Sequence, residues 1–449
     1  MKAVDLLELT RGRADAIALV APERTWSYAE LDGAVTTRAR ALRESGVDAG
    51  MAVPVTVHPD PRGMIELLAL WRVGATVVPL NPRLTEFERA AANAALRDAP
   101  SSAQAILWTS GTEGRPRGVA IGFEALMASA TGAEPRLGLA SDDVWLASLS
   151  PAHVGGLALI TRAILLGSTL VSVGPFDAAG AWACIGGLRV ANGPGVHVTH
   201  LSVVPTQLLR LLEASGDRPP PASFRCALVG GAGTPRELLE RAHAAKWPIA
   251  LTYGLTEATS QVATSPPELT RRKPGTVGKP LTATEIRLAP DGEILVRGKT
   301  LASGYIGEGV APLVDSAGWH HTGDLGRVDE DGDLWVIGRR ADRIVSGGVT
   351  VDAVEVEEAL RAHPQVADAC VVGVPDLEWG ERVAAWVEPA AEPVDLAALD
   401  GHVRARLSAA KVPRRYHVGG AIPRNANGKV DRQAVRAALA SAKGSPDLE

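Results

Sequence analysis

The 449-residue chain is predicted to be an α/β protein: a large body of stacked α/β sheets with a β subdomain, then a small mobile α+β domain. In the first part, short apolar runs rich in β-branched residues alternate with helical patterns, which indicates parallel sheets covered by helices. After Leu281, Asp291-Gly292 and Asp331-Gly332 each stand between alternating runs and predict antiparallel hairpins.

Composition limits the classes of function. An apolar content of 46% supports a large core and argues against disorder, and a net charge of −5 without a long basic run argues against nucleic acid as a partner. Cys184, Cys226 and Cys370 have no metal-binding spacing and fit buried thiols in a reducing cytoplasm. The first residues contain no apolar signal core, so we expect a cytoplasmic protein.

The strands of the body are expected at the apolar runs 53–57, 76–78, 105–108, 169–173, 198–204 and 227–229. The most hydrophobic window, 154–173, contains Arg162 and is broken by Gly167-Ser168. We interpret it as a core helix followed by a strand, and not as a membrane span.

A domain boundary is predicted at the charged segment 338–342, which gives domains of residues 1–338 and 339–449. Asp352 and Glu355 are spaced like a capping box that opens a helix to about Ala362. Strands at 369–374 and 382–387 and a helix at 396–407 are expected to complete the small domain.

The segment WTSGTEGRPRGV at 108–119 is the most informative part of the chain. A buried strand leads into a loop in which glycines allow close backbone approach while hydroxyls and two guanidiniums add donors and positive charge. That chemistry suits a polyphosphate, although Arg115-Pro116 after the second glycine excludes a Walker loop. The alternative is a surface loop rich in turn residues.

Other segments combine glycines with polar groups. The run 230–233 follows a strand and suits close approach to a flat ring or a phosphate, or simply a tight turn before a helix. In TYGLTE at 252–257, Thr256 and Glu257 could hold Mg²⁺, or could form an ordinary acidic helix start. His153 stands beside apolar residues, where a histidine is more often a satisfied core group than a ligand.

Asp329, Asp331 and Asp333 resemble the opening of a calcium loop. The expected glycine spacing and the distal glutamate are missing, so a hairpin turn explains them better.

Seven segments in a fixed order resemble the superfamily of adenylate-forming enzymes, which includes acyl- and aryl-CoA synthetases, peptide-synthetase adenylation domains and luciferases. They are SGTEGRPRG, SPAHVGG, GGAG, TYGLTE, HTGDLG, GRRADRIVSGG and IPRNANGK, and the resemblance covers nearly the whole chain. It implies ATP-dependent activation of a carboxylic acid to acyl-AMP, with Mg²⁺, followed by transfer to the thiol of CoA.

The resemblance also implies a role for each matching residue. Those expected around the β- and γ-phosphates are Ser110, Gly111, Thr112, Gly114 and Arg117. Those expected to frame the adenine are Gly231, Ala232, Gly233 and Tyr253, and those expected near the ribose are Asp324 and Arg339. Those expected in catalysis are Lys429, Thr256, Glu257 and His153, with Thr256 and Glu257 holding the α-phosphate and Mg²⁺.

By the same resemblance, the small domain then turns about a hinge near Ala341. Lys429 leaves the site, and the segment of Ser346, Gly347 and Gly348 arrives to admit the pantetheine arm of CoA.

The acid is suggested by three stretches, at 153–157, 198–205 and 253–261, that resemble the o-succinylbenzoate–CoA ligases of menaquinone synthesis. The chain also departs from the superfamily pattern. Glu113 stands where a threonine or serine is usual, Arg117 replaces a lysine, and the link from Leu84 to Ala105 is short enough to lack a strand–helix unit.

Two alternatives to a CoA ligase remain. One is a stand-alone adenylation enzyme that loads the phosphopantetheine of a separate carrier protein. The other is a non-catalytic nucleotide-binding protein on the same fold, which predicts losses at Lys429, Glu257 or the phosphate loop, and the sequence shows none.

Overall fold

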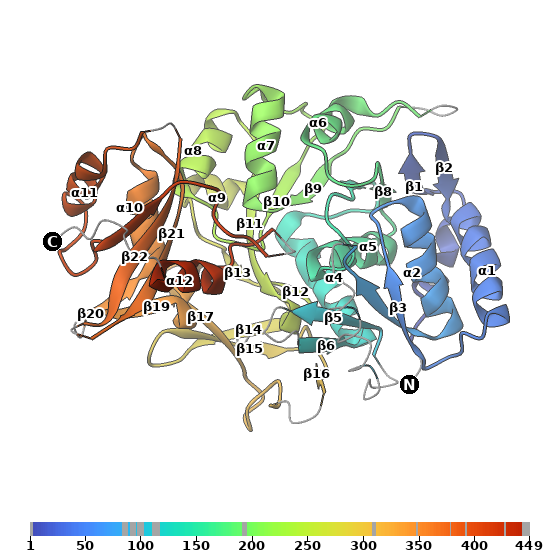
Figure 1. Ribbon diagram of the computed structural model, residues 1–449. Coiled ribbons are helices and arrows are strands. Elements are labelled where there is room, and N and C mark those ends of the chain that lie inside the picture. The colour runs from blue at the N-terminus through green and yellow to red at the C-terminus, as the bar shows by residue number, and fades with distance from the viewer. Residues whose placement is uncertain are drawn as a thin grey trace. The chain divides into compact units, whose positions relative to one another are not determined.

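The computed structural model describes residues 3–82, 89, 96, 103–109, 117–190, 195–307, 311–346, 349–377, 379–390, 393–425 and 428–441. The chain forms two compact units. Unit 1 comprises Met1–Leu288, Leu295–Thr322 and Val328–Trp335, and unit 2 comprises Ala289–Ile294, Gly323–Arg327 and Val336–Glu449. The predicted α/β class is confirmed (Figure 1), whereas the exact domain boundary at 338–339 stays a prediction.

The larger sheet of unit 1 has nine strands in the order β13-β12-β11-β10-β9-β7-β8-β1-β2. Their bounds are β1 (Ile17–Ala21), β2 (Arg24–Ser27), β7 (Val144–Leu146), β8 (Thr169–Val171), β9 (His200–Val203), β10 (Cys226–Val229), β11 (Ile249–Leu255), β12 (Ser260–Ser265) and β13 (Lys279–Pro280). Strands β9, β10 and β11 pair in parallel, as the alternation of strands and helices predicts, and β12 then reverses direction.

The second sheet has the order β16-β6-β5-β4-β3. Its strands are β3 (Ala52–Thr56), β4 (Thr76–Leu80), β5 (Ala105–Thr109), β6 (Arg117–Ile121) and β16 (Gly304–Ile306). The predicted strand before the phosphate loop is therefore confirmed as β5. It lies between β4 and β6.

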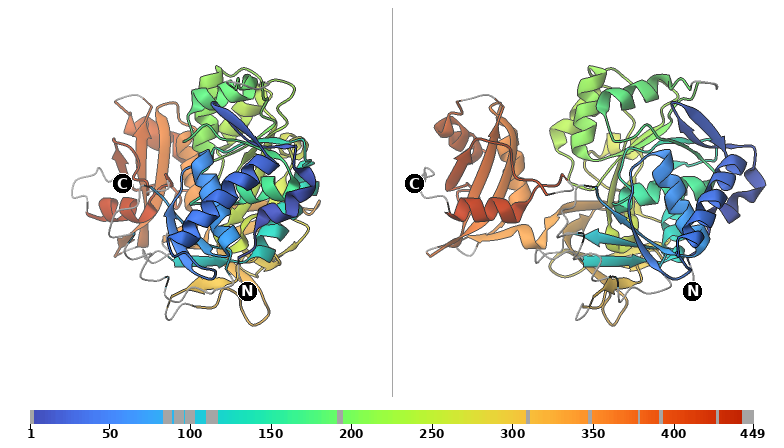
Figure 2. Two further views of the ribbon diagram at one scale, coloured as in Figure 1. Left: turned by 90° about the vertical axis from the view of Figure 1, so that its right-hand side faces the viewer. Right: turned by 45° about the vertical axis from the view of Figure 1, so that its right-hand side comes forward.

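The helical elements of unit 1 are η1 (Leu6–Arg13), α1 (Tyr28–Glu44), α2 (Pro61–Val73), α4 (Phe123–Leu137), α5 (Val154–Leu166), α6 (Ala178–Gly187), α7 (Pro205–Ser215), α8 (Arg236–Ala244), η3 (Thr256–Ala258) and α9 (Pro267–Arg272). Helices α1 and α2 lie side by side (Figure 2) and share one hydrophobic core with α4 and α5. The window 154–173 is α5 followed by β8, as predicted. In the described part of the chain, no helix has the length and apolar character needed to cross a bilayer.

A four-stranded sheet has the order β14-β15-β17-β18, with β14 (Thr284–Leu288), β15 (Glu293–Gly298), β17 (His320–Val328) and β18 (Leu334–Arg339). Each predicted hairpin joins two neighbouring strands of this sheet. Gly292 and Gly332 both adopt positive φ, at 85° and 81°, which explains why each turn carries a glycine.

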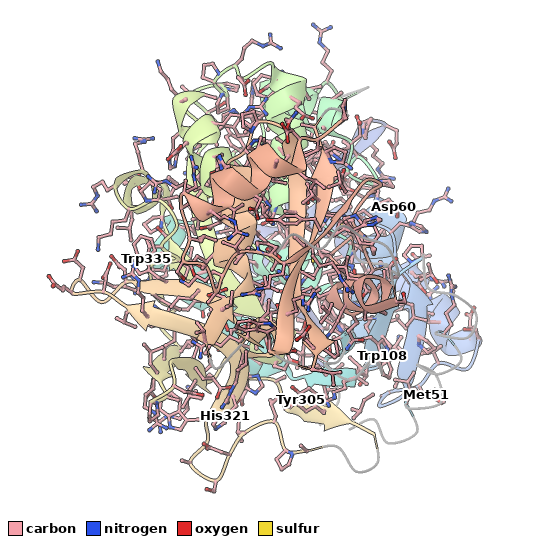
Figure 3. The ribbon with its side chains drawn as sticks, turned by 60° about the vertical axis from the view of Figure 1, so that its left-hand side comes forward. Met51, Asp60, Trp108, Tyr305, His321 and Trp335 are labelled. Carbon is pink, nitrogen blue, oxygen red and sulfur yellow. The ribbon has the colours of Figure 1, made fainter. Side chains whose placement is uncertain are left out.

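The second hairpin holds a lysine between three aspartates, where the sequence suggested a resemblance to a calcium loop. Lys273 Nζ lies 2.9 Å from Asp329, 2.5 Å from Asp331 and 2.8 Å from Asp333. Trp335, labelled in Figure 3, also donates its indole N–H to Asp329. These contacts support the hairpin interpretation, because the ammonium group supplies the positive charge that a metal ion would otherwise bring to the three carboxylates.

We expect Lys273→Met to lower the free energy of unfolding most strongly near neutral pH. Hydrogen bonds from Trp335 and Lys273 hold the pKa of Asp329 well below its usual range. A lowered carboxyl pKa stabilises the fold above its unfolded value, about 3.9, and this stabilisation is lost as the pH falls through the folded value. Urea unfolding at several pH values should show the difference from the parent shrinking in acid, whereas Lys299→Met, at an exposed site of unit 1, should have little effect.

Unit 2 also contains a sheet in the order β20-β19-β22-β21, to which β23 adds by pairing with β22. Its elements are η4 (Arg340–Asp342), β19 (Arg343–Ser346), β20 (Val349–Asp352), α10 (Ala353–Arg361), β21 (Val366–Asp376), β22 (Gly380–Pro389), α11 (Leu396–Arg404), β23 (Arg415–Val418) and α12 (Arg432–Ser441). The predicted strands and helices are present. The capping box is wrong, because Asp352 accepts from Val354 while Glu355 instead binds Lys411 at 2.6 Å.

Candidate functional site

Glu257 is held at the end of β11 by a tyrosine that the sequence did not point to. The Tyr305 hydroxyl lies 3.1 Å from Glu257 Oε1, and the Arg117 guanidinium lies 5.9 Å from the centre of the Tyr305 ring. Strand β16 brings Tyr305 there by pairing with β6, opposite Val119. Figure 3 labels Tyr305 together with Trp108 of β5, in the same sheet.

The contact orients the Glu257 carboxylate. Burial, and then the charge of Glu257, raises the pKa of Tyr305, so the phenol stays protonated and donates. The Glu257 carbonyl also accepts from the Ala302 N–H at 2.8 Å. Thr256 and Glu257 together offer a hydroxyl and a carboxylate, which are oxygen donors of the kind that Mg²⁺ binds, so these residues fit the expected ion.

The segment that carries Glu257 is backbone-strained. Thr256 to Ala258 form the short turn η3, and Thr259 and Ser260 then adopt positive φ of 51° and 95°. Such conformations are uncommon outside glycine and cluster at functional sites. The alternative of an ordinary helix start is therefore wrong, because the segment turns back into β12 instead of continuing as an α-helix.

The glycine segment after β10 lies beside the TYGLTE segment. Val229 pairs with Leu251, and a Cβ on Gly230 would lie 2.6 Å from the Thr252 side chain. Gly231 has φ +81°, whereas a Cβ on Gly233 would meet nothing within 4 Å. Parallel pairing thus places the residues expected at the adenine, including the buried Tyr253, at adjacent strand ends.

Gly254 has a different role from the other glycines of these motifs. A Cβ at this position would lie 1.7 Å from the carbonyl oxygen of Ser260, at the irregular pairing between β11 and β12. The glycine is therefore required by backbone packing.

His153 is the N-cap residue of α5, in the segment that the resemblance places near the acid. Its Nε2 lies 3.4 Å from Asn81 Nδ2. Gly156 is needed one turn later, because a Cβ there would lie 2.2 Å from the Ser150 carbonyl oxygen. The histidine is half-buried and not a core group.

Arg162, later in the same helix, is a buried cation that sequence reasoning used only to exclude a membrane span. Its side chain lies between α5 and the nine-stranded sheet, 2% exposed, with Nη2 donating to Gln261 Oε1 at 2.8 Å and the guanidinium 5.2 Å from the Trp145 ring. Among the described residues, Arg162 Nε, Arg162 Nη1 and the Trp145 indole nitrogen have no hydrogen-bond partner.

Among the described residues, the two titratable neighbours of Arg162, His200 and Cys226, do not supply a counter-charge. Burial, and then Arg162 itself, lowers the pKa of His200 to about 4, and burial raises the pKa of Cys226 to about 12. Both groups are therefore neutral at pH 7. Burial lowers the pKa of Arg162 only to about 10, so the guanidinium stays charged. The only signal in the sequence was an arginine inside the most apolar window, and it did not reveal the missing partner.

In unit 2, the two residues expected at the ribose contact each other. Arg339 Nε donates to Asp324 Oδ1 at 2.9 Å, and Asp324 is 6% exposed. The guanidinium holds one carboxylate oxygen in a fixed direction.

Lys429 is exposed on unit 2, and the described residues beside it bond to one another. Gly428 has φ +76° and donates to the Asn425 carbonyl at 2.8 Å, while the Lys429 N–H donates to Asn425 Oδ1 at 3.1 Å. Ser346 lies at the end of β19, opposite Val349, and is buried.

Several predicted residues lie outside the described part of the chain. They are Ser110, Gly111, Thr112, Glu113, Gly114, Gly347 and Gly348. Most of the shortened link from Leu84 to Ala105 also lies outside it.

Comparison with known proteins identifies the family. The model of the AMP-binding enzyme family matches residues 8–98 and 89–306, and that of the AMP-binding enzyme C-terminal domain matches 355–429. A 2-succinylbenzoate–CoA ligase of Bacillus anthracis is 34% identical over 94% of this chain and 95% of its own.

Solved structures agree. The o-succinylbenzoate CoA synthetase (MenE) of Bacillus subtilis, in complex with the acyl-adenylate intermediate OSB-AMP, is 29% identical and matches with a TM-score of 0.88 over 99% of this chain and 100% of its own. The same enzyme with ATP and magnesium ion matches with a TM-score of 0.87 over 98% of this chain and 100% of its own. The chain therefore belongs to the AMP-binding enzyme family and is an AMP-forming acid–thiol ligase.

Proposed function

We propose that the ligase uses ATP and Mg²⁺, that its acid is 2-succinylbenzoate and that its acceptor is free CoA in the cytoplasm. Relatives that cover 91% or more of this chain, from Bacillus anthracis and a Geobacillus strain, are named 2-succinylbenzoate–CoA ligases, which supports CoA as the acceptor. The cysteines are free buried thiols, in keeping with a reducing compartment.

The observation that carries the choice of acid is the buried guanidinium of Arg162. 2-Succinylbenzoate has two carboxylates, of which one is activated and the other remains an anion. A charged group buried without a counterion is costly, and a second carboxylate would supply the missing charge and acceptors. Arg162 lies on α5, the helix whose N-cap residue is His153.

The roles of the remaining residues follow from their chemistry. Thr256 and Glu257 would hold the α-phosphate and Mg²⁺, and the ion supplies positive charge to the phosphate oxygens. Arg117 and the preceding loop would bind the β- and γ-phosphates, the glycine segment and Tyr253 the adenine, and Asp324 with Arg339 the ribose. Lys429 would stabilise the charge that develops when a carboxylate attacks the anionic α-phosphate. His153 would lie where the acid reaches that phosphate.

After adenylation, unit 2 would withdraw Lys429 and present the segment of Ser346, Gly347 and Gly348 to the thiol. Glycines in that segment would leave room for the pantetheine arm.

Arg162→Met should selectively weaken 2-succinylbenzoate. Loss of hydrogen bonds to a charged group costs about 1.5–3 kcal/mol, so we expect KM for this acid to rise about 10- to 100-fold in ATP–pyrophosphate exchange. The KM for the analogue that lacks the aromatic carboxylate should differ little between the parent and Arg162→Met. If the parent and the variant discriminate equally between 2-succinylbenzoate and this analogue, Arg162 does not contact the acid. If the parent enzyme is inactive with 2-succinylbenzoate, the proposed substrate is wrong. Thioester detection with CoA and with a pantetheinylated carrier protein tests the acceptor.

A further inference from the structure

Unit 2 contains a continuous series of ion pairs that the proposed mechanism does not use. It is formed by six side chains of alternating charge, called here the charge chain: Asp342, Arg432, Glu357, Arg361, Asp368 and Arg424. One end of the charge chain, Asp342, lies in η4 next to the predicted hinge residue Ala341. The other end, Arg424, lies in the loop of Lys429.

The hinge end is anchored to α12. Arg432 Nε lies 3.1 Å from Asp342 Oδ2, and Arg432 Nη1 lies 2.6 Å from Glu357 Oε1 and donates to the Val371 carbonyl at 2.7 Å. One guanidinium therefore joins η4, α10 and β21. Arginine suits this position because its planar fork fixes several acceptors at once.

The middle of the charge chain lies between α10 and β21. Arg361 contacts Glu357 at 3.3 Å and Asp368 at 2.9 Å, and Glu357 also accepts from the Val371 N–H at 2.9 Å. The Glu357 side chain is only 4% exposed, so its charge is weakly screened by water. The hydrogen bonds to the Val371 N–H and carbonyl make this section of the charge chain stiffer than an ion pair between two surface side chains.

The far end reaches the peptide that precedes the catalytic lysine. Arg424 donates through Nη2 to Asp368 at 2.8 Å and through Nη1 to the Gly428 carbonyl at 3.3 Å. Arg424 also forms a backbone bridge with Val430, so both sides of Lys429 are held. The position of the lysine backbone is thus tied to β21 through one guanidinium.

We propose that the charge chain is a positioning device for Lys429, with Arg424 as the positioning residue that fixes its loop. The proposal rests on the role of Lys429 in adenylation stated above. The charge chain connects the lysine loop rigidly to Asp342, the residue that follows the hinge residue Ala341. A rotation at the hinge would therefore move Lys429 together with the rest of unit 2. Misplacement by about 1 Å can cost about 100-fold in rate, so a modest loosening of the loop is measurable.

The test is the ratio of the two half-reactions in Arg424→Met. We expect kcat for acyl-adenylate formation to fall about 10-fold, with KM for ATP and thioester formation from supplied acyl-AMP within about twofold of the parent. Arg424→Lys keeps the charge opposite Asp368 but loses the fork, and should show a smaller selective loss of about threefold. The control is Arg404→Met, which removes the Arg404–Asp400 pair of α11 and should change neither half-reaction.

Equal losses in both half-reactions, or no loss in adenylation, would overturn the proposal. If Arg424→Met does not fold, Arg424→Lys decides, and parent-like adenylation by that variant would count against positioning. Lys429→Ala separates the two levels of the argument. If Lys429→Ala is inactive in adenylation and the Arg424 variants are not impaired, the function stands and the positioning role fails; if Lys429→Ala is fully active, the role of Lys429 itself is wrong.

Discussion

Lys429→Ala is expected to lower the rate of acyl-adenylate formation about 100- to 1000-fold. Removal of one preorganised charge contact typically costs about 2.7–4 kcal/mol of transition-state stabilisation. The lysine is exposed on unit 2, and the described residues beside it bond to one another. ATP–pyrophosphate exchange measures this step, and thioester formation from supplied acyl-AMP should stay close to the parent rate because the proposed role of the lysine is confined to the first half-reaction.

The matched control is Lys411→Ala, another lysine of unit 2, whose ammonium group binds Glu355 at 2.6 Å. It should leave pyrophosphate exchange unchanged. Exchange by Lys429→Ala within a factor of about three of the parent, which is below about 1 kcal/mol, would show that the lysine is not in the adenylation site.

Gly254→Ala is expected to destabilise unit 1 by about 3 kcal/mol. The new Cβ would lie 1.7 Å from the Ser260 carbonyl oxygen, a distance that no rotamer change can relieve because the backbone fixes the positions of both atoms. The strands β11 and β12 would have to separate at the point where Thr259 and Ser260 already adopt positive φ. Urea unfolding followed by tryptophan fluorescence would measure the loss.

Gly186→Ala provides the comparison, since a Cβ there meets nothing within 4 Å and the residue lies in α6. Alanine in a helix is favoured over glycine, so this variant should be as stable as the parent or slightly more so. If Gly254→Ala has the same unfolding midpoint as the parent, β11 and β12 accommodate the new Cβ without a loss of stability, and the prediction is wrong.

Local patterns in the sequence predicted most of the fold. The strand at 105–109, the hairpins at Asp291-Gly292 and Asp331-Gly332 and the elements of the small domain all follow from apolar periodicity and turn residues close together in the chain. These signals are reliable because each depends on neighbours within a few residues.

The interactions that complete the candidate site depend on residues far apart, and a single sequence does not contain them in readable form. Tyr305 reaches Glu257 only because β16 pairs with β6. Glu355 has the spacing of a capping residue, yet its carboxylate binds Lys411, which is 56 residues away in the sequence. The missing counterion of Arg162 is a property of its packed surroundings, which no local pattern reports.

Arg162 also affects the stability of the folded protein. A guanidinium that is buried with unsatisfied nitrogen atoms lowers the stability of the empty enzyme, since apolar residues of similar volume would pack there at less cost. The acid would recover this free energy on binding, so occupancy and thermal stability become linked quantities. With the proposed acid, selection for a more stable fold at this position would oppose selection for recognition of a second carboxylate.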